Sequence, residues 1–313
     1  MAEGPPLSRR AGYNARMCVR LSSRFLPLLL LLLATLHGCR PTAAGGLLFA
    51  SARSGNWEIY YQATPEAEPQ NLTRYPSGER FPDWSPDRHQ LVLASDRSGS
   101  FGLYLLEPDG NNLRLLTDSP YPDTSPRWSR RNQIVFVSER ADRNEELYLV
   151  DAGGGEPRRL TQDPAPDYDP AWYPDGQSLV FVSLRSGSPE LYRLDLASGT
   201  AQALTRDTAD KRSPDVSPDG RQIVFARRPS GSDWQLVLLE PASGQTRILA
   251  AQPGWLGMPR WRNSDELLFA AEGAQGQRIY RLNLAEGKQV EVATGLRPVQ
   301  VGSGKNMDRE AVQ

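Results

Sequence analysis

The sequence predicts an all-β protein, a six-bladed β-propeller, and three observations carry this prediction. An apolar triplet occurs six times, and consecutive copies begin 44, 43, 45, 44 and 44 residues apart. A Tyr, a Leu-Thr pair and a Pro follow most copies at nearly fixed offsets. Each period holds four short β-type segments, and a period of about 40–45 residues with four strands per unit is typical of propeller blades. The triplets begin at Leu47, Leu91, Ile134, Leu179, Ile223 and Leu267.

Residues 134–176 illustrate how one copy builds a blade. Residues 134–138 and 146–151 are expected to form the two middle strands, and residues 158–161 a more polar outer strand. Three consecutive glycines, 153–155, allow a tight connection that other residues adopt at a steric cost. Residues 163–176 then return the chain to the axis and supply the inner strand of the next blade.

A proline and an aromatic residue mark each inner strand. We expect the proline to precede the strand, since proline is tolerated at the first residue or free edge of a strand. Two residues later most copies have a Trp, which we expect to pack blade against blade. The prolines are Pro82, Pro126, Pro170, Pro214, Pro259 and Pro298, and the following residues are Trp84, Trp128, Trp172, Val216 and Trp261. Ser-Pro-Asp-Gly at 217–220 and its variants are typical β-turns.

The two ends of the repeat region predict how the ring closes. No inner strand precedes Leu47, whereas Pro298 in the segment 296–302 aligns with the other five prolines. We therefore expect residues 296–302 to supply the missing inner strand of the blade built by residues 46–74, which removes exposed sheet edges. The propeller would span residues 46–302, and residues 303–313 would form a disordered tail.

The N-terminal segment has the features of an export signal. Residues 25–36 are an almost unbroken apolar run behind Arg20 and Arg24. This run is shorter than the roughly 20 residues that span a bilayer, and its length and flanks suit a secretory signal. Met17 would give a more usual signal than Met1, so the true start is expected there.

Leu36-His37-Gly38-Cys39 resembles the bacterial lipobox. The expected organisation is a signal peptide over 1–38 and a lipidated tether over 39–45, with the lipid on Cys39 holding the domain at a membrane surface. The alternative is an ordinary signal that is cleaved after Ala44 and releases a soluble secreted protein. Either product would be extracytoplasmic, in the periplasm or elsewhere in a bacterial cell envelope.

Composition excludes several classes of function. The net charge is −1, and the first 39 residues hold five Arg and one acidic residue, so the remainder is modestly acidic. A basic face for nucleic acid is therefore not expected.

Both cysteines, Cys18 and Cys39, precede the first repeat, so no disulfide or thiolate is expected in the propeller. Beyond residue 39 the only His is His89, in a turn, which leaves no Ser-His-Asp triad or His-rich zinc site. We expect no catalytic residue and no cofactor.

The repeated pattern Pro-x-Trp-Ser-Pro-Asp-Gly, Ile-Val-Phe-x-Ser-x-Arg, Glu-Leu-Tyr, Leu-Thr resembles the repeats of the TolB-like propeller family over residues 46–302. The resemblance implies a six-bladed propeller of the cell envelope. TolB itself has an α/β domain ahead of its propeller, and we expect that domain to be missing here.

Two sets of charged residues remain to be explained. The Ser-x-Arg element recurs, and we expect its Arg to pair with a turn Asp. The arginines are Arg53, Arg97, Arg140, Arg185 and the relic Arg228, and the candidate acids are Asp87, Asp175 and Asp219. The second set stands three residues before each proline, where the loops should ring one mouth of the channel.

This rim is predicted to be acidic on one arc and basic to aromatic on the other. Its residues are Glu79, Asp123, Asp167, Asp169, Asp210, Lys211, Arg212 and Trp255. The favoured hypothesis is a non-catalytic, lipid-anchored and monomeric scaffold that binds an envelope protein or peptide at this mouth. The alternative is a metal-dependent propeller that binds a small molecule or carbohydrate, or acts on it, through Glu79, Asp123 and Asp167. A third possibility is an accessory subunit that works through its outer blade surfaces.

Overall fold

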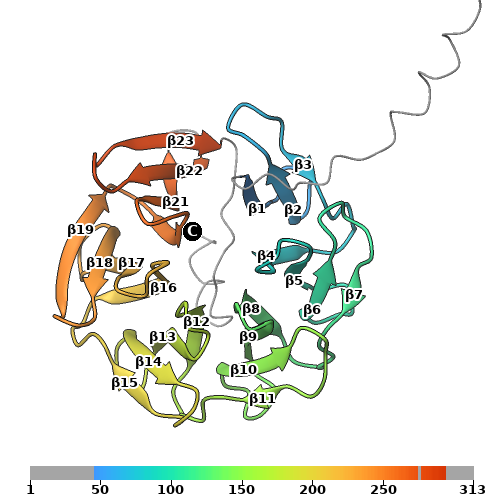
Figure 1. Cartoon of the computed structure of the whole chain (residues 1–313), viewed down its shortest axis with the longest axis horizontal. Coiled ribbons are helices and arrows are strands. Elements are labelled where there is room, and N and C mark those ends of the chain that lie inside the picture. The colour runs from blue at the N-terminus through green and yellow to red at the C-terminus, as the bar shows by residue number, and fades with distance from the viewer. Residues whose placement is uncertain (1–45, 274–275, 294–313) are drawn as a thin grey trace, which may run out of the picture. The chain divides into compact units, whose positions relative to one another are not determined.

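The computed structural model describes residues 46–273 and 276–293, which lie in one compact unit. In these residues 23 strands form six antiparallel sheets that are arranged in a ring (Figure 1). The first sheet has three strands and the other five have four. Strand order within every sheet follows the sequence, so each blade is a meander. The six-bladed all-β prediction is confirmed.

Blades 1 to 3 contain the first eleven strands. Their bounds are β1 (Leu47–Ser51), β2 (Glu58–Gln62), β3 (Gln70–Asn71), β4 (Glu79–Trp84), β5 (Leu91–Ser95), β6 (Gly102–Leu106), β7 (Arg114–Leu115), β8 (Asp123–Trp128), β9 (Gln133–Ser138), β10 (Glu146–Asp151) and β11 (Arg158–Arg159).

Blades 4 to 6 contain the other twelve strands, and the outer strands of blades 5 and 6 are longer. Their bounds are β12 (Asp167–Trp172), β13 (Ser178–Ser183), β14 (Glu190–Asp195), β15 (Ala201–Ala203), β16 (Asp210–Val216), β17 (Ile223–Arg228), β18 (Gln235–Glu240), β19 (Gln245–Ala251), β20 (Leu256–Trp261), β21 (Glu266–Gly273), β22 (Gly276–Asn283) and β23 (Gln289–Ala293).

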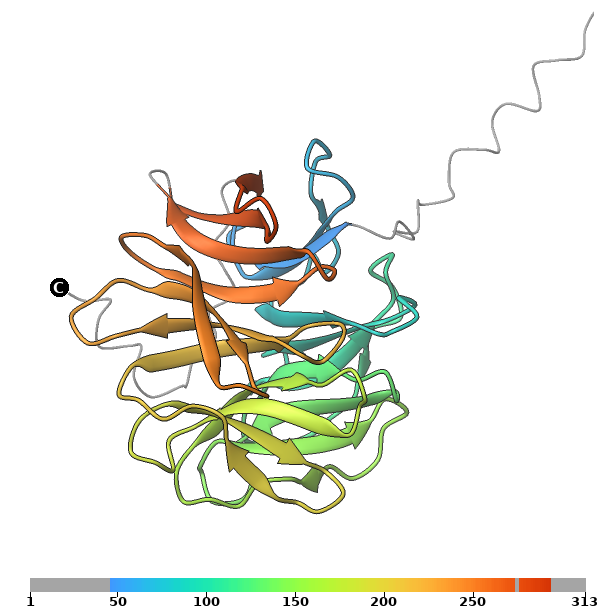
Figure 2. The same ribbon diagram turned by 60° about the vertical axis from the view of Figure 1, so that its left-hand side comes forward.

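The core lies between neighbouring blades rather than at one centre. The apolar triplet lies in β1 of blade 1 and in the second strand of blades 2 to 6, and in β5 every residue is buried because both faces of the sheet pack on another blade. Each apolar cluster joins one pair of neighbours, which Figure 2 shows as twisted sheets set side by side. Trp84, Trp128, Trp172 and Trp261 each belong to the cluster shared with the preceding blade, as predicted.

The prolines do not precede the inner strands, which corrects the sequence-based expectation. In blades 2 to 6 each proline lies within the strand, at a shift of register such as that between Arg80 and Asp83. A bulge leaves one residue outside the ladder, so a residue without an N–H is tolerated there. The preceding residues have left-handed backbone angles: Phe81 (φ 53°), Ser125 (50°), Asp169 (52°), Ser213 (50°) and Met258 (54°).

Several expectations concern segments outside the described residues. These are the signal peptide over 1–38, the tether over 39–45 with Cys39, the closing segment 296–302 and the tail over 303–313. Blade 1 has three strands in the described part of the chain, as the closure hypothesis requires, but the fourth strand remains a prediction. Within the described ranges no helix is long and apolar enough to cross a membrane.

Candidate functional site

The first residue of the inner strand in blades 2 to 4 is a buried carboxylate held by the Ser-x-Arg arginine of the same blade. The Nη2 atoms of Arg97, Arg140 and Arg185 lie 3.1, 2.7 and 2.6 Å from carboxylate oxygens of Glu79, Asp123 and Asp167, respectively. All three carboxylate side chains have no exposed surface. The Ser of the motif accepts a hydrogen bond from the Nε of its Arg at 2.8–3.1 Å.

These ion pairs correct the expected partners of the arginines. The turn carboxylates of Asp87 and Asp219 instead accept hydrogen bonds from a Ser hydroxyl and a backbone N–H of their own turns. The arginines also stack on aromatic rings, with Arg97 Cζ 4.9 Å from the centre of the Tyr104 ring and Arg185 Cζ 4.8 Å from that of Tyr192. The acid, Ser, Arg and Tyr of the motif thus form one contact set inside each of these blades.

A second buried carboxylate starts β2, β10 and β14 in blades 1, 3 and 4. Glu58, Glu146 and Glu190 each accept a hydrogen bond from the Thr of the Leu-Thr pair. That Thr hydroxyl in turn accepts a bond from a backbone N–H, as from Leu147 at 3.0 Å. Burial raises the pKa of Glu58 and of Glu146, and the nearby charges of Glu79 and Asp167 act in the same direction.

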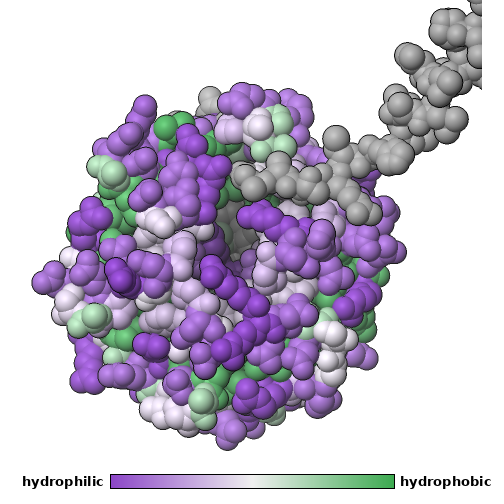
Figure 3. Space-filling model, in the orientation of Figure 1, coloured by the Kyte–Doolittle hydropathy of each residue, from purple (hydrophilic) through white to green (hydrophobic). Residues whose placement is uncertain are grey.

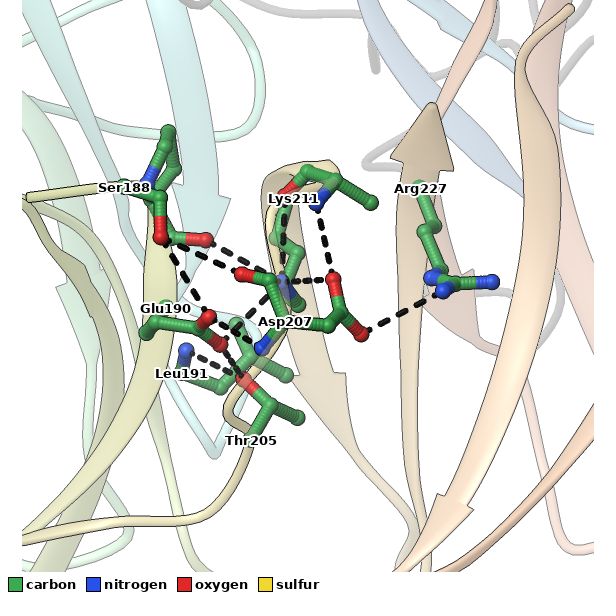
Figure 4. Close-up of polar contacts among 9 residues, drawn as sticks. Ser188, Glu190, Leu191, Thr205, Asp207, Lys211 and Arg227 are labelled. Atoms are coloured by element: carbon green, nitrogen blue, oxygen red, sulfur yellow. Dashed lines mark hydrogen bonds and ion pairs between the residues drawn. The ribbon is translucent and has the colours of Figure 1, made fainter. Parts of the chain in front are cut away.

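Lys211 replaces the inner-strand carboxylate in blade 5. Its ammonium is fully buried, 3.1 Å from Glu190 of blade 4 and 2.7 Å from Asp207. It also donates to the carbonyl of Ala209 at 3.0 Å. Figure 4 shows Asp207 between Lys211 and Arg227, whose guanidinium lies 3.3 Å from the other Asp207 oxygen. Lys211 therefore binds two blades together.

These contacts correct the prediction that the side chains of the rim are exposed. Glu79, Asp123, Asp167 and Lys211 are fully buried and cannot touch a docked molecule in this conformation. Asp169 is also buried: its carboxylate accepts the Ser213 N–H of the next blade at 2.8 Å, and burial raises its pKa.

Three rim residues keep contact with solvent, all in blade 5 or just before blade 6. Asp210 and Arg212 are half-buried, with Asp210 2.9 Å from Arg228 and Arg212 Cζ 5.8 Å from the centre of the Trp234 ring. Trp255 is half-buried and lies over Gly257, where a Cβ would meet its ring at 2.9 Å. The side that stays accessible is thus the basic and aromatic arc.

The metal-site alternative is not supported. Each carboxylate of the proposed set is already bound to its own arginine, and within residues 46–273 and 276–293 no group of three or more His, Cys, Asp or Glu side chains could hold a metal ion. His89 is exposed in its turn, as expected.

Sequence reasoning missed a ring of residues deeper in the channel, directly after the bulge prolines. These are Asp83, Arg127, Ala171, Asp215 and Arg260, and all five line one pocket of about 320 Å³. Burial raises the pKa of Asp83, and burial followed by the charge of Asp83 raises that of Asp215 to about 7. The sequence did contain a sign of this ring. The residue between the regular Pro and Trp changes its charge from copy to copy, in the order Asp, Arg, Ala, Asp and Arg.

Figure 3 shows a mainly hydrophilic face with a hollow at the centre of the ring. The two ends of the channel differ in the residues that surround them. The inner strands begin at the rim, and they end at the pocket, where the Ser-Pro-Asp-Gly turns follow.

Comparison with known proteins gives the family. The model of the TolB beta propeller domain matches residues 118–291. No curated protein matches the sequence. TolB from Acinetobacter baumannii is similar in structure, with 20% identity and a TM-score of 0.71 over 81% of this chain and 64% of that one. This chain thus spans less than two thirds of that protein.

Two further structures show how widely the fold is used. A putative TolB from Agrobacterium tumefaciens has 20% identity and a TM-score of 0.64, over 79% of this chain and 90% of that one. An oligogalacturonate lyase in complex with manganese has 17% identity and a TM-score of 0.59, over 80% and 74%. At such identities the likeness concerns the fold alone, and an enzyme is among the neighbours. Since the family model covers more than half of the sequence and six blades form the ring, the chain belongs to the TolB β-propeller family.

Proposed function

We propose that the chain is a non-catalytic scaffold of the bacterial cell envelope, lipid-anchored through Cys39, which binds a protein or peptide at the mouth where the inner strands begin. Membership in the TolB β-propeller family supports the scaffold role and the location in the cell envelope. The N-terminal sequence supports the location and the anchor.

One observation carries the docking site. The repeated ionic residues of blades 2 to 4 are bound within their own blades, whereas the rim at blades 5 and 6 leaves Asp210, Arg212 and Trp255 in contact with solvent. A half-buried Trp and a half-buried Arg match the residue types that dominate protein interfaces. The repeated set has the same contacts in three successive blades, so its chemistry is structural.

The test is affinity capture from the solubilised envelope of the host, with the full-length chain as bait. The matched baits are Arg212→Glu and Trp255→Ala at the rim, and Arg221→Glu at an exposed turn of the opposite end. We expect a protein that is recovered by the wild type and by Arg221→Glu and is lost with both rim variants. Equal recovery by all four folded baits would reject the rim as the docking site.

Membrane attachment is tested separately with Cys39→Ser. We expect the variant to leave the membrane fraction and to lose incorporation of labelled palmitate. Unchanged labelling would reject lipidation at Cys39 without affecting the docking proposal.

A further inference from the structure

The pocket at the far end of the channel is built by a module that occurs twice. Asp83 and Arg127 stand in blades 2 and 3, and Asp215 and Arg260 occupy the same positions in blades 5 and 6. The two arginines are three blades apart in a six-bladed ring, so they face each other across the axis. Between the two modules stands Ala171, whose small side chain leaves the space open.

The two aspartates are engaged in joining neighbouring blades. Asp83 Oδ2 accepts the backbone N–H of Trp128 at 2.8 Å, and Asp215 Oδ2 accepts that of Trp261 at 2.7 Å. Each bond fixes the backbone next to an arginine of the following blade. The Trp172 indole adds to this by donating to the carbonyl of Arg127 at 2.9 Å. Both arginines therefore project from a backbone that is held in place.

The guanidinium groups, in contrast, have few partners. Arg127 and Arg260 each donate through Nη1 to the carbonyl of the preceding proline, at 3.2 and 2.9 Å. Within the described ranges neither lies within 4.0 Å of a carboxylate oxygen, and Arg127 Nε is buried without a hydrogen-bond partner. A guanidinium has five N–H donors, and buried donors are almost always satisfied. Most N–H donors of the Arg127 and Arg260 guanidinium groups are thus available to a third group.

We propose that this pocket binds a carboxylate-bearing ligand between Arg127 and Arg260. A planar carboxylate matches the paired donors of a guanidinium, and it satisfies them better than a neutral acceptor does. Trp128, Trp172 and Trp261 supply flat apolar walls around it. Burial raises the pKa of Asp215 to about 7, which reduces its negative charge near neutral pH, so this group opposes an anion less than an ordinary carboxylate would.

The carboxylate could belong to a small organic acid or to the end of a peptide, and two probe pairs separate these sources. Binding to the full-length chain in mild detergent is measured by titration calorimetry with succinate against succinamide, and with triglycine against triglycine amide. Each pair differs mainly in carboxylate charge. Preference for succinate alone indicates a small acid, and preference for triglycine indicates a peptide end.

The variants Arg127→Gln and Arg260→Gln test the two arginines, and Arg228→Gln at the opposite mouth is the matched control. We expect each pocket variant to weaken binding of the charged probe by at least about tenfold and the control to leave it unchanged. Arg260→Gln keeps the test valid if Arg127→Gln does not fold. The proposal is overturned if neither charged probe binds better than its neutral counterpart, or if the folded variants bind as the wild type does. Either result leaves the rim proposal standing, because the two sites lie at opposite ends of the channel.

Discussion

The junction between blades 3 and 4 and the junction between blades 4 and 5 place different charges at equivalent positions. At the first, Glu146 faces Asp167, and each carboxylate finds its own arginine, Arg159 or Arg185. At the second, Glu190 faces Lys211 directly, 3.1 Å away. Both junctions thus keep the Glu that binds Thr, but the residue across the junction can carry either sign of charge. What differs is whether a buried charge is compensated within a blade or between blades.

The largest effect is expected from Lys211→Met. This change leaves Glu190 buried without its cation, and breaking a buried ion pair typically costs about 3–5 kcal/mol. We expect a loss of that size in the free energy of unfolding, measured by urea denaturation. Lys288→Met, at an exposed position, is the control and should change stability by less than about 0.5 kcal/mol.

A second substitution sharpens this result. In Lys211→Met/Glu190→Gln the uncompensated charge is gone, so part of the lost stability should return. If the double variant were as unstable as the sum of both single variants, the cross-blade pair would not be the source of the effect.

A smaller loss is expected when compensation within a blade is removed by Arg185→Met. Asp167 is fully buried, but Arg185 is 22% exposed, so water replaces part of what the guanidinium supplies. We expect a loss of about 2 kcal/mol by urea denaturation. Arg206→Met on the same blade, which is exposed, serves as control. A loss equal to that of Lys211→Met would remove the distinction between the two junctions.

At the junction of blades 5 and 6 the half-buried carboxylate of Asp215 forms no ion pair with any residue that the structure describes, and its signature is pH dependence. The folded-state pKa of Asp215 is raised from 3.8 to about 7, so the folded form holds this proton more tightly than the unfolded chain does. Its contribution to stability is therefore full below about pH 3.8 and is lost as the pH rises to about 7. In Asp215→Asn, which keeps an acceptor for Trp261 N–H, the melting temperature should fall less across this window. Parallel curves for the two proteins would contradict the assignment.

The smallest effect is expected from Glu146→Gln. The pKa of Glu146 is raised, chiefly by burial, so its contribution to stability is also lost as the pH rises above 4.5. Compared with the wild type, the variant should gain in melting temperature between pH 4.5 and pH 8. Glu286→Gln, at an exposed position, should follow the wild-type curve. The same gain in both variants would show that net charge, not the junction, is responsible.

The blades were predictable from the sequence because the residues that make them repeat. The apolar triplets and the Trp residues have the same role in every copy, which is to pack one blade on the next. Their regular spacing in the sequence therefore predicts that role. The partners of the arginines were not predictable in this way. Arg185 and Asp167 are 18 residues apart and meet only because β12 and β13 pair, whereas Asp175 is closer in sequence but stays in its turn.

The site was less accessible to sequence reasoning than the fold. Polar residues before a proline suggest a solvated loop, but Glu79 and its equivalents are the first residues of strands and are covered by their arginines. The channel pocket depends on Asp83 and Asp215, whose partners lie 45 and 46 residues away in the next blade. Such contacts follow from ring geometry and not from any local pattern.

The two modes of charge compensation have a consequence for how freely blades can be exchanged. Blade 3 carries its acid, Ser, Arg and Tyr together, so a copy placed elsewhere in the ring would bring a complete ionic set with it. Blade 5 lacks that independence, because Lys211 depends on Glu190 of the blade before it. A ring in which blades 4 and 5 were separated would leave Glu190 buried without its cation, whereas Lys211 would keep only Asp207 as a carboxylate partner. The order of these two blades is thus fixed by a single pair of side chains, while blade 3 remains interchangeable in this respect.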